Sequence, residues 1–259
     1  MRVIDWKDFT RGTSPPKQVA LTIGTFDSLH VGHQRLIREV VDNGCGALGA
    51  VCTFHQNPAL ALGSRPISGS ILSLNQKINK LEALGVALVV LIDFSAEISK
   101  LSGKRFLDLL ADRLDIKKLV VGYNFHMGRG RDTNARELVV MLAGSQTELE
   151  VIPATTYQEE VVSSSRIRES ILQGRFQEVQ DMLKDDFRLD LSETSIRRRG
   201  GRSWVRRSEI HQVLPQKGEY RVLFSTERGE FPGILCIEDE QIFWQREFAG
   251  TEIEIRFLE

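Results

Sequence analysis

The chain has 259 residues, with 34 basic and 35 acidic side chains and a formal net charge of -1. Apolar residues make up 41% of it, enough for a substantial core. The balanced charge gives no bias toward nucleic acid or membrane surfaces. The charged N-terminal segment predicts no signal peptide, and no apolar run reaches the roughly 18 residues of a membrane helix. Three cysteines at spacings that suit no metal site predict buried thiols in a reducing compartment. We therefore expect a cytoplasmic monomer with neither nucleic-acid nor membrane partners.

The first two thirds of the chain alternate strand and helix patterns. Apolar runs predict strands at 19–24, 47–54, 86–92, 118–122 and 149–153. Periodic apolar positions predict helices at 31–43, 73–84, 106–114, 134–143, 165–173 and 176–183. Gly44 is placed to stop the first helix, and Ser73 with Gln76 forms a capping box at the start of the second. The alternation predicts a doubly wound parallel sheet.

The pattern changes after about residue 187. Segments at 219–224, 233–238, 241–244 and 251–257 are typical of short antiparallel strands separated by turns. We therefore predict two domains, 1–186 and 187–259. A basic run at 196–207, IRRRGGRSWVRR, is interpreted as a solvated or flexible loop, the alternative being a phosphate- or RNA-binding patch. Trp204 is its one aromatic residue, so stacking on single-stranded nucleic acid has little support.

The segment GTFDSLHVGH at 24–33 directly follows the first predicted strand. In an open α/β sheet, ligands bind beyond the carboxyl ends of the strands, where a helix N-terminus offers free N–H groups to phosphate. His30 and His33 can both face that point, and Gly32 lets the backbone approach closely. Their imidazoles can donate to phosphate oxygens as negative charge develops in a transition state. We interpret this turn as a phosphate-binding site rather than as two histidines that merely cap a helix.

The same segment resembles the H-x-G-H signature of nucleotidyltransferases. Its G-x-F-D-x-x-H-x-G-H form is similar to the adenylyltransferase module of bacterial bifunctional riboflavin kinase/FMN adenylyltransferases, the FAD synthetases. Three later segments resemble that family in the same order: FHQNP at 54–58, VGYNFHMGRGR at 121–131 and VSSSRIRES at 162–170. FHQNP departs from the family's F-x-P-H-P at Gln56 and Asn57. The resemblance implies a Rossmann-like doubly wound sheet followed by a small antiparallel β-barrel domain.

The resemblance also implies the reaction and its residues: transfer of AMP from ATP to FMN, which yields FAD and pyrophosphate. The residues expected to carry catalysis are His30, His33, Asn124, Ser164 and Arg168. Those expected to bind ATP are Gly24, Thr25, Phe26, Asp27, Gly32 and Ser165. Those expected to bind FMN are Asn57, Pro58, Gly122, Asn124 and Phe125. Mg²⁺ is expected to arrive bound to ATP, with no metal site on the protein.

The C-terminal module of the family is a riboflavin kinase on a small β barrel with a P-T-A-N signature. This chain has no asparagine after Asn134, and its later threonines Thr194, Thr226 and Thr251 do not follow a proline. The segment PQKGEYRVLF at 215–224 still resembles a strand of that barrel. We therefore expect a degenerate kinase domain without riboflavin kinase activity.

Two alternatives are compatible with these residues. The acceptor of an adenylyl or cytidylyl group could be another phosphorylated metabolite, such as nicotinamide mononucleotide, phosphopantetheine or glycerol 3-phosphate. Otherwise the chain could be a non-catalytic regulator that binds a flavin or a nucleotide. A panel of acceptors with ATP, scored for pyrophosphate release, separates FMN from another acceptor, and formation of FAD from FMN and MgATP separates the enzyme from the regulator.

Overall fold

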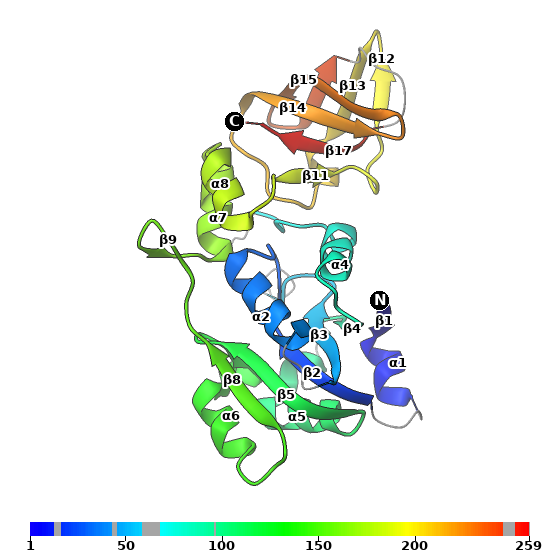
Figure 1. Cartoon of the computed structure of the whole chain (residues 1–259). Coiled ribbons are helices and arrows are strands. Elements are labelled where there is room, and N and C mark those ends of the chain that lie inside the picture. The colour runs from blue at the N-terminus through cyan, green and yellow to red at the C-terminus, as the bar shows by residue number, and fades with distance from the viewer. Residues whose placement is uncertain (13–16, 43–45, 59–67, 96, 246–251, 259) are drawn as a thin grey trace.

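A computed structural model describes residues 1–12, 17–42, 46–58, 68–95, 97–245 and 252–258 (Figure 1). A six-stranded parallel sheet forms the N-terminal part, and a curled seven-stranded antiparallel sheet forms the C-terminal part. The predicted fold class, a doubly wound α/β sheet followed by a β-barrel-like domain, is therefore confirmed.

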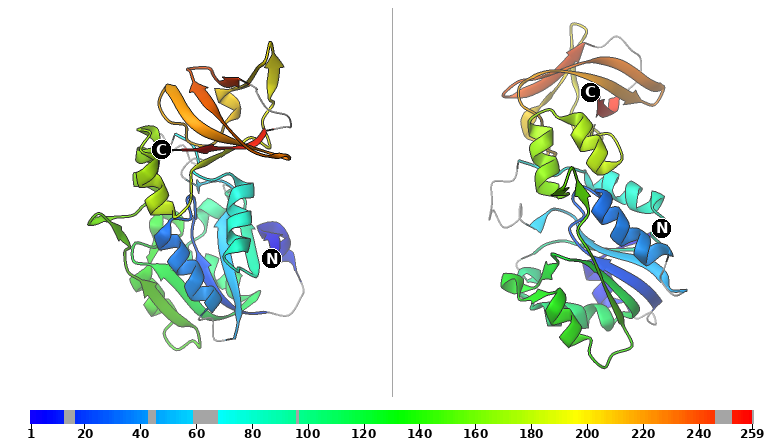
Figure 2. Two further views of the ribbon diagram at one scale, coloured as in Figure 1. Left: turned by 45° about the horizontal axis from the view of Figure 1, so that its top comes forward. Right: turned by 60° about the vertical axis from the view of Figure 1, so that its left-hand side comes forward.

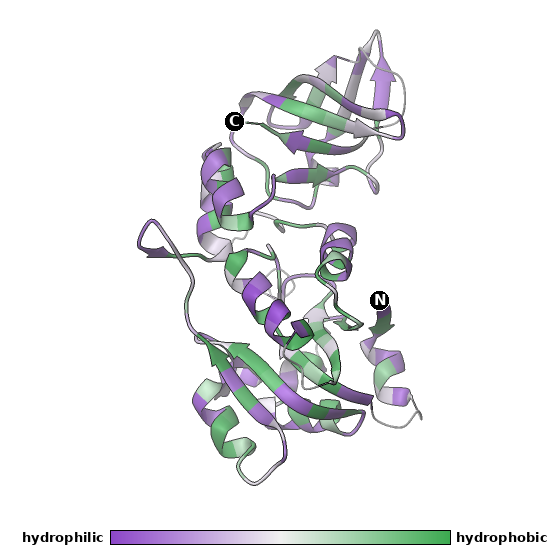
Figure 3. Cartoon of the chain, viewed as in Figure 1, coloured by the Kyte–Doolittle hydropathy of each residue, from purple (hydrophilic) through white to green (hydrophobic). Residues whose placement is uncertain are grey.

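The parallel sheet is buried on both faces. Its strands, in spatial order, are β1 (Arg2–Asp5), β4 (Leu88–Ile92), β3 (Leu48–Phe54), β2 (Lys17–Ile23), β5 (Leu114–Gly122) and β8 (Glu148–Ile152). Helices α2 (Val31–Asp42) and α4 (Leu74–Ala83) pack on one face. The other face is covered by α1 (Trp6–Arg11), α5 (Gly103–Ala111) and α6 (Ala135–Met141) (Figure 2). Every residue of β4 is buried, as expected for a parallel strand covered on each side. The helix α2 carries both hydrophilic and hydrophobic residues, as its mixed colours in Figure 3 show.

Within the parallel sheet, two strands differ most from the prediction. Strand β1 was not predicted, because it is only four residues long. Its partner β4 lies far along the chain, with Arg2 opposite Leu88, 86 positions later. The helix predicted at 106–114 ends at Ala111, and β5 already begins at Leu114. The alternation of buried and partly buried residues in its first half marks this longer strand. The predicted stop at Gly44 lies outside the described residues.

The antiparallel sheet includes the basic run. Its strands, in spatial order, are β11 (Arg188–Asp190), β17 (Glu252–Phe257), β14 (Gly218–Thr226), β15 (Gly229–Ile237), β16 (Gln241–Gln245), β13 (Arg202–Arg206) and β12 (Arg197–Arg199). The interpretation of 196–207 as a loop is wrong, because it forms the β12–β13 hairpin. Gly200 and Gly201 both have positive φ, which a two-residue hairpin turn requires. The Arg202 guanidinium lies 4.3 Å from the centre of the Phe243 ring.

One hydrophobic core joins the antiparallel sheet to the two helices before it, α7 (Ser164–Leu172) and α8 (Phe176–Leu183). Phe176 of α8 stacks on Phe257 of β17 with ring centroids 4.6 Å apart. Trp244, fully buried, is among the largest side chains of this core. The sheet begins at Arg188 although its core also includes the two helices, so the division at residue 187 stays a prediction.

The remaining described elements are short. They are β6 (His126–Met127) paired with β7 (Thr133–Asn134), β9 (Thr156–Tyr157) paired with β10 (Glu160–Val161), and the 3-10 turns η1 (Ile98–Lys100), η2 (Arg129–Arg131) and η3 (Arg207–Glu209). No helix in the described ranges combines the length and the apolar character needed to cross a membrane. Cys52 is buried as predicted, whereas Cys236 is only partly buried, and Cys45 lies outside the described residues.

Candidate functional site

A cavity of about 750 Å³ lies at the carboxyl edge of the parallel sheet. From β2 the chain builds β3 and β4 on one side and later β5 and β8 on the other, so the order of strands reverses between β2 and β5. Ligands of open α/β sheets bind at such a switch point. The segments after β2, β5 and β8 all line the cavity, including Gly24, Tyr123 and Pro153.

The turn from β2 to α2 forms one end of this cavity. Phe26 and Leu29 have φ values of 46° and 48°, a region that non-glycine residues rarely adopt, and both side chains are buried. A β-carbon on Gly24 would lie 3.1 Å from the Phe26 ring, and one on Gly32 would lie 3.1 Å from the His30 ring. The two glycines therefore leave room for the aromatic rings that hold the turn in its strained shape.

The two histidines of the turn stack on each other, with ring centroids 3.7 Å apart. The backbone N–H of His33 donates to Nδ1 of His30 at 3.2 Å, which leaves the proton of a neutral His30 on Nε2. Burial lowers the pKa of His30 to about 4 and that of His33 well below its usual value. Both rings are therefore neutral at pH 7, and each can offer one N–H to a ligand.

Unpaired polar atoms border the same end of the cavity. Within the described part of the chain, Nδ1 of His33 and Oγ1 of Thr155 are buried without a hydrogen-bond partner. Both residues line the cavity, and a buried polar atom without a partner is costly. These two atoms are thus placed to bond to a ligand.

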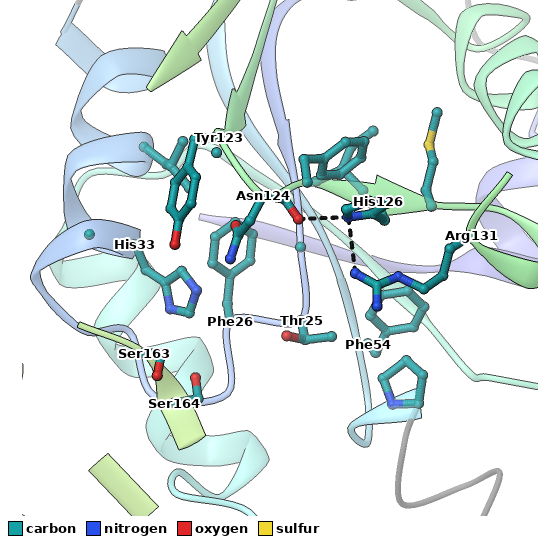
Figure 4. A pocket seen from close by; sticks show the side chains of 18 of the residues that line it. Thr25, Phe26, His33, Phe54, Tyr123, Asn124, His126, Arg131, Ser163 and Ser164 are labelled. Atoms are coloured by element: carbon teal, nitrogen blue, oxygen red, sulfur yellow. Dashed lines mark hydrogen bonds between the residues drawn. The ribbon is translucent and has the colours of Figure 1, made fainter. Parts of the chain in front are cut away.

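The N-terminus of α7 meets the N-terminus of α2 at this end. Ser163 is the N-cap of α7, its hydroxyl accepting from the backbone N–H of Arg166 at 3.2 Å. The hydroxyls of Ser164 and Ser28 lie 3.0 Å apart. Ser163 and Ser164 both line the cavity (Figure 4). Two helix N-termini with free N–H groups make this end suitable for phosphate.

A buried ionic cluster lies behind the turn. Arg168 forms an ion pair with Asp27 and donates to the carbonyls of Gly69 and Ser164 at 3.1 and 3.3 Å. Lys77 donates from Nζ to the carbonyl of Thr25 at 3.2 Å. Burial raises the pKa of Asp27 against the opposing effect of the two cations, and burial lowers the pKa of Lys77 to about 8. Because Arg168 and Lys77 both act on the single carboxylate of Asp27, a net positive charge remains beneath the turn.

The opposite end of the cavity is apolar and aromatic. Its lining residues include Phe54, Pro58, Phe94, Ile98, Leu101, Phe106, Phe125 and Met127. The rings of Phe54 and Phe94 meet edge to face with centroids 5.8 Å apart. Asn124, from the loop after β5, lies between this end and the histidines (Figure 4). Flat aromatic walls suit a planar ring system.

The structure brings together most of the predicted site residues. Those that line the cavity are Gly24, Thr25, Phe26, His30, Gly32, His33, Pro58, Gly122, Asn124, Phe125 and Ser164. Four others are not among the lining residues: Asp27, Asn57, Ser165 and Arg168. Asp27 and Arg168 are turned toward each other instead, so their predicted contacts with ATP stay predictions.

Several lining residues were not predicted as site residues. Tyr123, His126 and Arg131 belong to the 121–131 segment, and His126 Nδ1 lies 2.8 Å from the Asn124 carbonyl and 3.0 Å from Arg131 Nη2 (Figure 4). Phe94 and Thr155 each stand two residues beyond a predicted strand. The position of a residue just after a strand end is the signal that could have found them.

The charge of the cavity suits an anion. Among the described lining residues there is no carboxylate, and Arg131 supplies a positive charge. The described residues also contain no group of three or more His, Cys, Asp or Glu side chains that could hold a metal ion. An anion at the histidine end would therefore be bound by N–H and O–H groups of the protein.

The family model and the similar proteins agree on one family. A family model described as FAD synthetase matches residues 13–166. The bifunctional riboflavin kinase/FMN adenylyltransferase of Listeria monocytogenes is 23% identical over 276 residues, covering 98% of this chain and 85% of the relative. That of Bacillus subtilis is 24% identical, covering 92% and 78%. A crystal structure of a macrolide-efflux protein from Streptococcus pneumoniae has a TM-score of 0.83 at 20% identity, covering 100% of this chain and 90% of that one, and shows the same fold.

Proposed function

The chain belongs to the FAD synthetase family and is an FMN adenylyltransferase, and we propose that it catalyses this reaction without phosphorylating riboflavin. The observation that supports adenylyl transfer is one cavity with a phosphate-binding end and an aromatic end. The phosphates of ATP would meet the two helix N-termini, and the flavin ring would enter between Phe54 and Phe125. We also propose that the protein acts as a cytoplasmic monomer.

The proposed step is an in-line displacement at the α-phosphorus of ATP. An oxygen of the FMN phosphate forms the new P–O bond, and the bond from the α-phosphorus to the bridging oxygen breaks, so that pyrophosphate leaves with the electron pair. Because the FMN phosphate is already an anion, the step needs no strong base. Catalysis then consists mainly of positioning and of stabilising the developing charge.

The turn supplies donors at the point where this charge develops. The N–H groups of His30 and His33 would stabilise the α- and β-phosphates, and Ser164 would donate to the terminal phosphates. Because burial keeps both rings uncharged in the free protein, as the lowered pKa of His30 shows, their contribution is hydrogen bonding rather than full charge. Asn124 would orient the attacking phosphate.

The remaining predicted residues keep supporting roles in this proposal. Gly24, Thr25, Phe26 and Gly32 would shape the wall against the nucleotide, and Ser165 would add an N–H at the start of α7. Asp27 and Arg168 would act from behind the turn. On the flavin side the proposed contacts are Asn57, Pro58, Gly122 and Phe125.

Mg²⁺ fits this site as a companion of the substrate. The described lining residues include no carboxylate, whereas Mg²⁺ in nucleotide sites is bound largely by phosphate oxygens and water. When bound with ATP the ion would neutralise phosphate charge. The residues of this chain would hold the phosphates themselves.

The absence of riboflavin kinase activity rests on the missing P-T-A-N segment, since no asparagine follows Asn134. The test is to incubate the purified protein with MgATP and either FMN or riboflavin and to separate the flavins by chromatography. We expect FAD from FMN and no FMN from riboflavin. Pyrophosphate release with nicotinamide mononucleotide, phosphopantetheine or glycerol 3-phosphate, but not with FMN, would contradict the proposed acceptor.

A further inference from the structure

A short segment of the N-terminal part, Gly69–Lys77, which we call the bridge, is built into the C-terminal β domain. Ser70 exchanges backbone hydrogen bonds with the strand-like segment around Gln212: its N–H donates to His211 at 2.9 Å, and its carbonyl accepts from Val213 at 2.8 Å. Gly69 approaches so closely that a β-carbon there would lie 2.7 Å from the Gln212 carbonyl carbon. The bridge therefore follows the position of this segment of the β domain.

The side chain of Gln212 reinforces the attachment and is 5% exposed. Its Oε1 accepts from the backbone N–H of Asp190 at 2.7 Å within the β domain. Its Nε2 donates to the carbonyl of Ile71 at 2.9 Å and to Oε1 of Gln76 at 3.1 Å. Gln76 in turn donates to Glu254 of β17 at 2.8 Å. A buried amide with this many partners holds the bridge in one place.

The other side of the bridge touches the phosphate turn. The N–H of Leu72 donates to the backbone carbonyl of Asp27 at 3.1 Å. Lys77, 4% exposed, donates from Nζ to the carbonyls of Thr25 at 3.2 Å and of Phe54 at 2.9 Å. Thr25 and Phe54 line the two ends of the cavity. The bridge thus contacts the phosphate turn at two backbone carbonyls, those of Asp27 and Thr25, and the aromatic end at one, so a shift of the bridge would act mainly on the phosphate turn.

We propose that the β domain positions the adenylyl-transfer site through the bridge, with Gln212 as the positioning residue. The inference rests on the proposed function and gives the domain a role although its kinase signature is missing. Gln212 does not line the cavity, so its effect passes through Ile71, Gln76 and Lys77. Its loss should disturb the alignment of the reacting phosphates rather than the affinity for FMN.

The test replaces Gln212 by leucine in the full chain. The matched control is Gln216→Leu, because Gln216 is exposed in the same domain four positions away. Initial rates of FAD formation give kcat and KM for FMN at a temperature where circular dichroism shows each variant to be folded. We expect kcat of Gln212→Leu to fall about tenfold, since small misplacements of reacting groups are costly, with KM for FMN within about twofold. Gln216→Leu should match the unaltered protein.

A second variant keeps the test decisive if Gln212→Leu does not fold. Gln76→Met removes the bridge partner of Gln212 and leaves the β-domain core intact, and it should show the same split between kcat and KM. A purely structural role would lower the midpoint of unfolding and leave kcat per folded molecule unchanged, which would overturn the inference while FAD synthesis stands. If the unaltered protein makes no FAD, the proposed function fails, and the inference fails with it.

Discussion

Replacement of Arg168 by methionine separates two roles for this guanidinium. The family resemblance implies a contact with the phosphates of ATP, whereas the structure pairs the guanidinium with Asp27. The two side chains are 11% and 5% exposed, so the ion pair is buried. Methionine retains much of the apolar stem and removes the charge together with the hydrogen bonds to Gly69 and Ser164.

The expected loss follows from the charge left behind. Removing one partner of a buried ion pair costs about 3–5 kcal/mol, because the other charge stays in a poorly solvated place. Lys77 acts on the same carboxylate and lowers its pKa, so it replaces part of the lost attraction. We therefore expect Arg168→Met to lower the free energy of unfolding by about 3 kcal/mol, the lower end of that range. The double variant Asp27→Asn/Arg168→Met leaves no unpaired carboxylate. We expect its loss of free energy of unfolding to be about 1–2 kcal/mol smaller than the sum of the losses of the two single variants.

The assay is urea unfolding at pH 7.5, followed by circular dichroism, together with kcat and KM for ATP. Arg35→Met is the control, because Arg35 is exposed on α2 and lies outside the lining of the cavity. An Arg168→Met protein with the stability of the unaltered chain and a KM for ATP raised tenfold or more would contradict this prediction. Such a result would mean that the guanidinium binds the phosphates of ATP and that the ion pair with Asp27 contributes little to stability.

Three further predictions concern the histidines and the bridge. His33→Ala should lower kcat at least about a hundredfold with an unchanged circular dichroism spectrum, because it removes a donor to developing charge, and near-normal FAD formation would contradict this role. The pKa of His30 is about 4 when folded and 6.5 when unfolded, so the unfolded state binds more protons between these values. The contribution of His30 to the free energy of unfolding is then fully present above pH 6.5 and decreases as the pH falls, by about 2 kcal/mol at pH 5. His30→Gln should remove this pH-dependent loss in urea titrations. Ser73→Ala removes both the N-cap of α4 and a 2.5 Å hydrogen bond to Asp190, and should cost about 1–2 kcal/mol. Ser102→Ala, which removes only a cap of α5, should cost less, and equal losses would show that the bond across to the β domain adds nothing.

Local patterns were enough to predict most of the parallel sheet. The apolar run of β4 and the capping box of Ser73 and Gln76 depend on neighbours within a few residues, and both are present in the structure. The turn around His30 was recognisable for the same reason, because glycines and histidines at this spacing right after a strand constrain the backbone whatever the rest of the chain does. The β12–β13 hairpin was missed, since charge hid the inward alternation of Ser203 and Val205.

Local residue patterns are enough for the class of fold and the phosphate turn, whereas contacts between distant parts of the chain settle which side chains face the cavity. Asp27 is only three positions from His30, yet its carboxylate is turned away from the cavity by Arg168, 141 positions further along the chain. Ser73 and Gln76 were predicted as a helix cap, and only the folded chain shows that they also attach the bridge to the β domain. A backbone turn is set by its own residues, but the direction of a buried polar side chain depends on partners that folding brings from elsewhere.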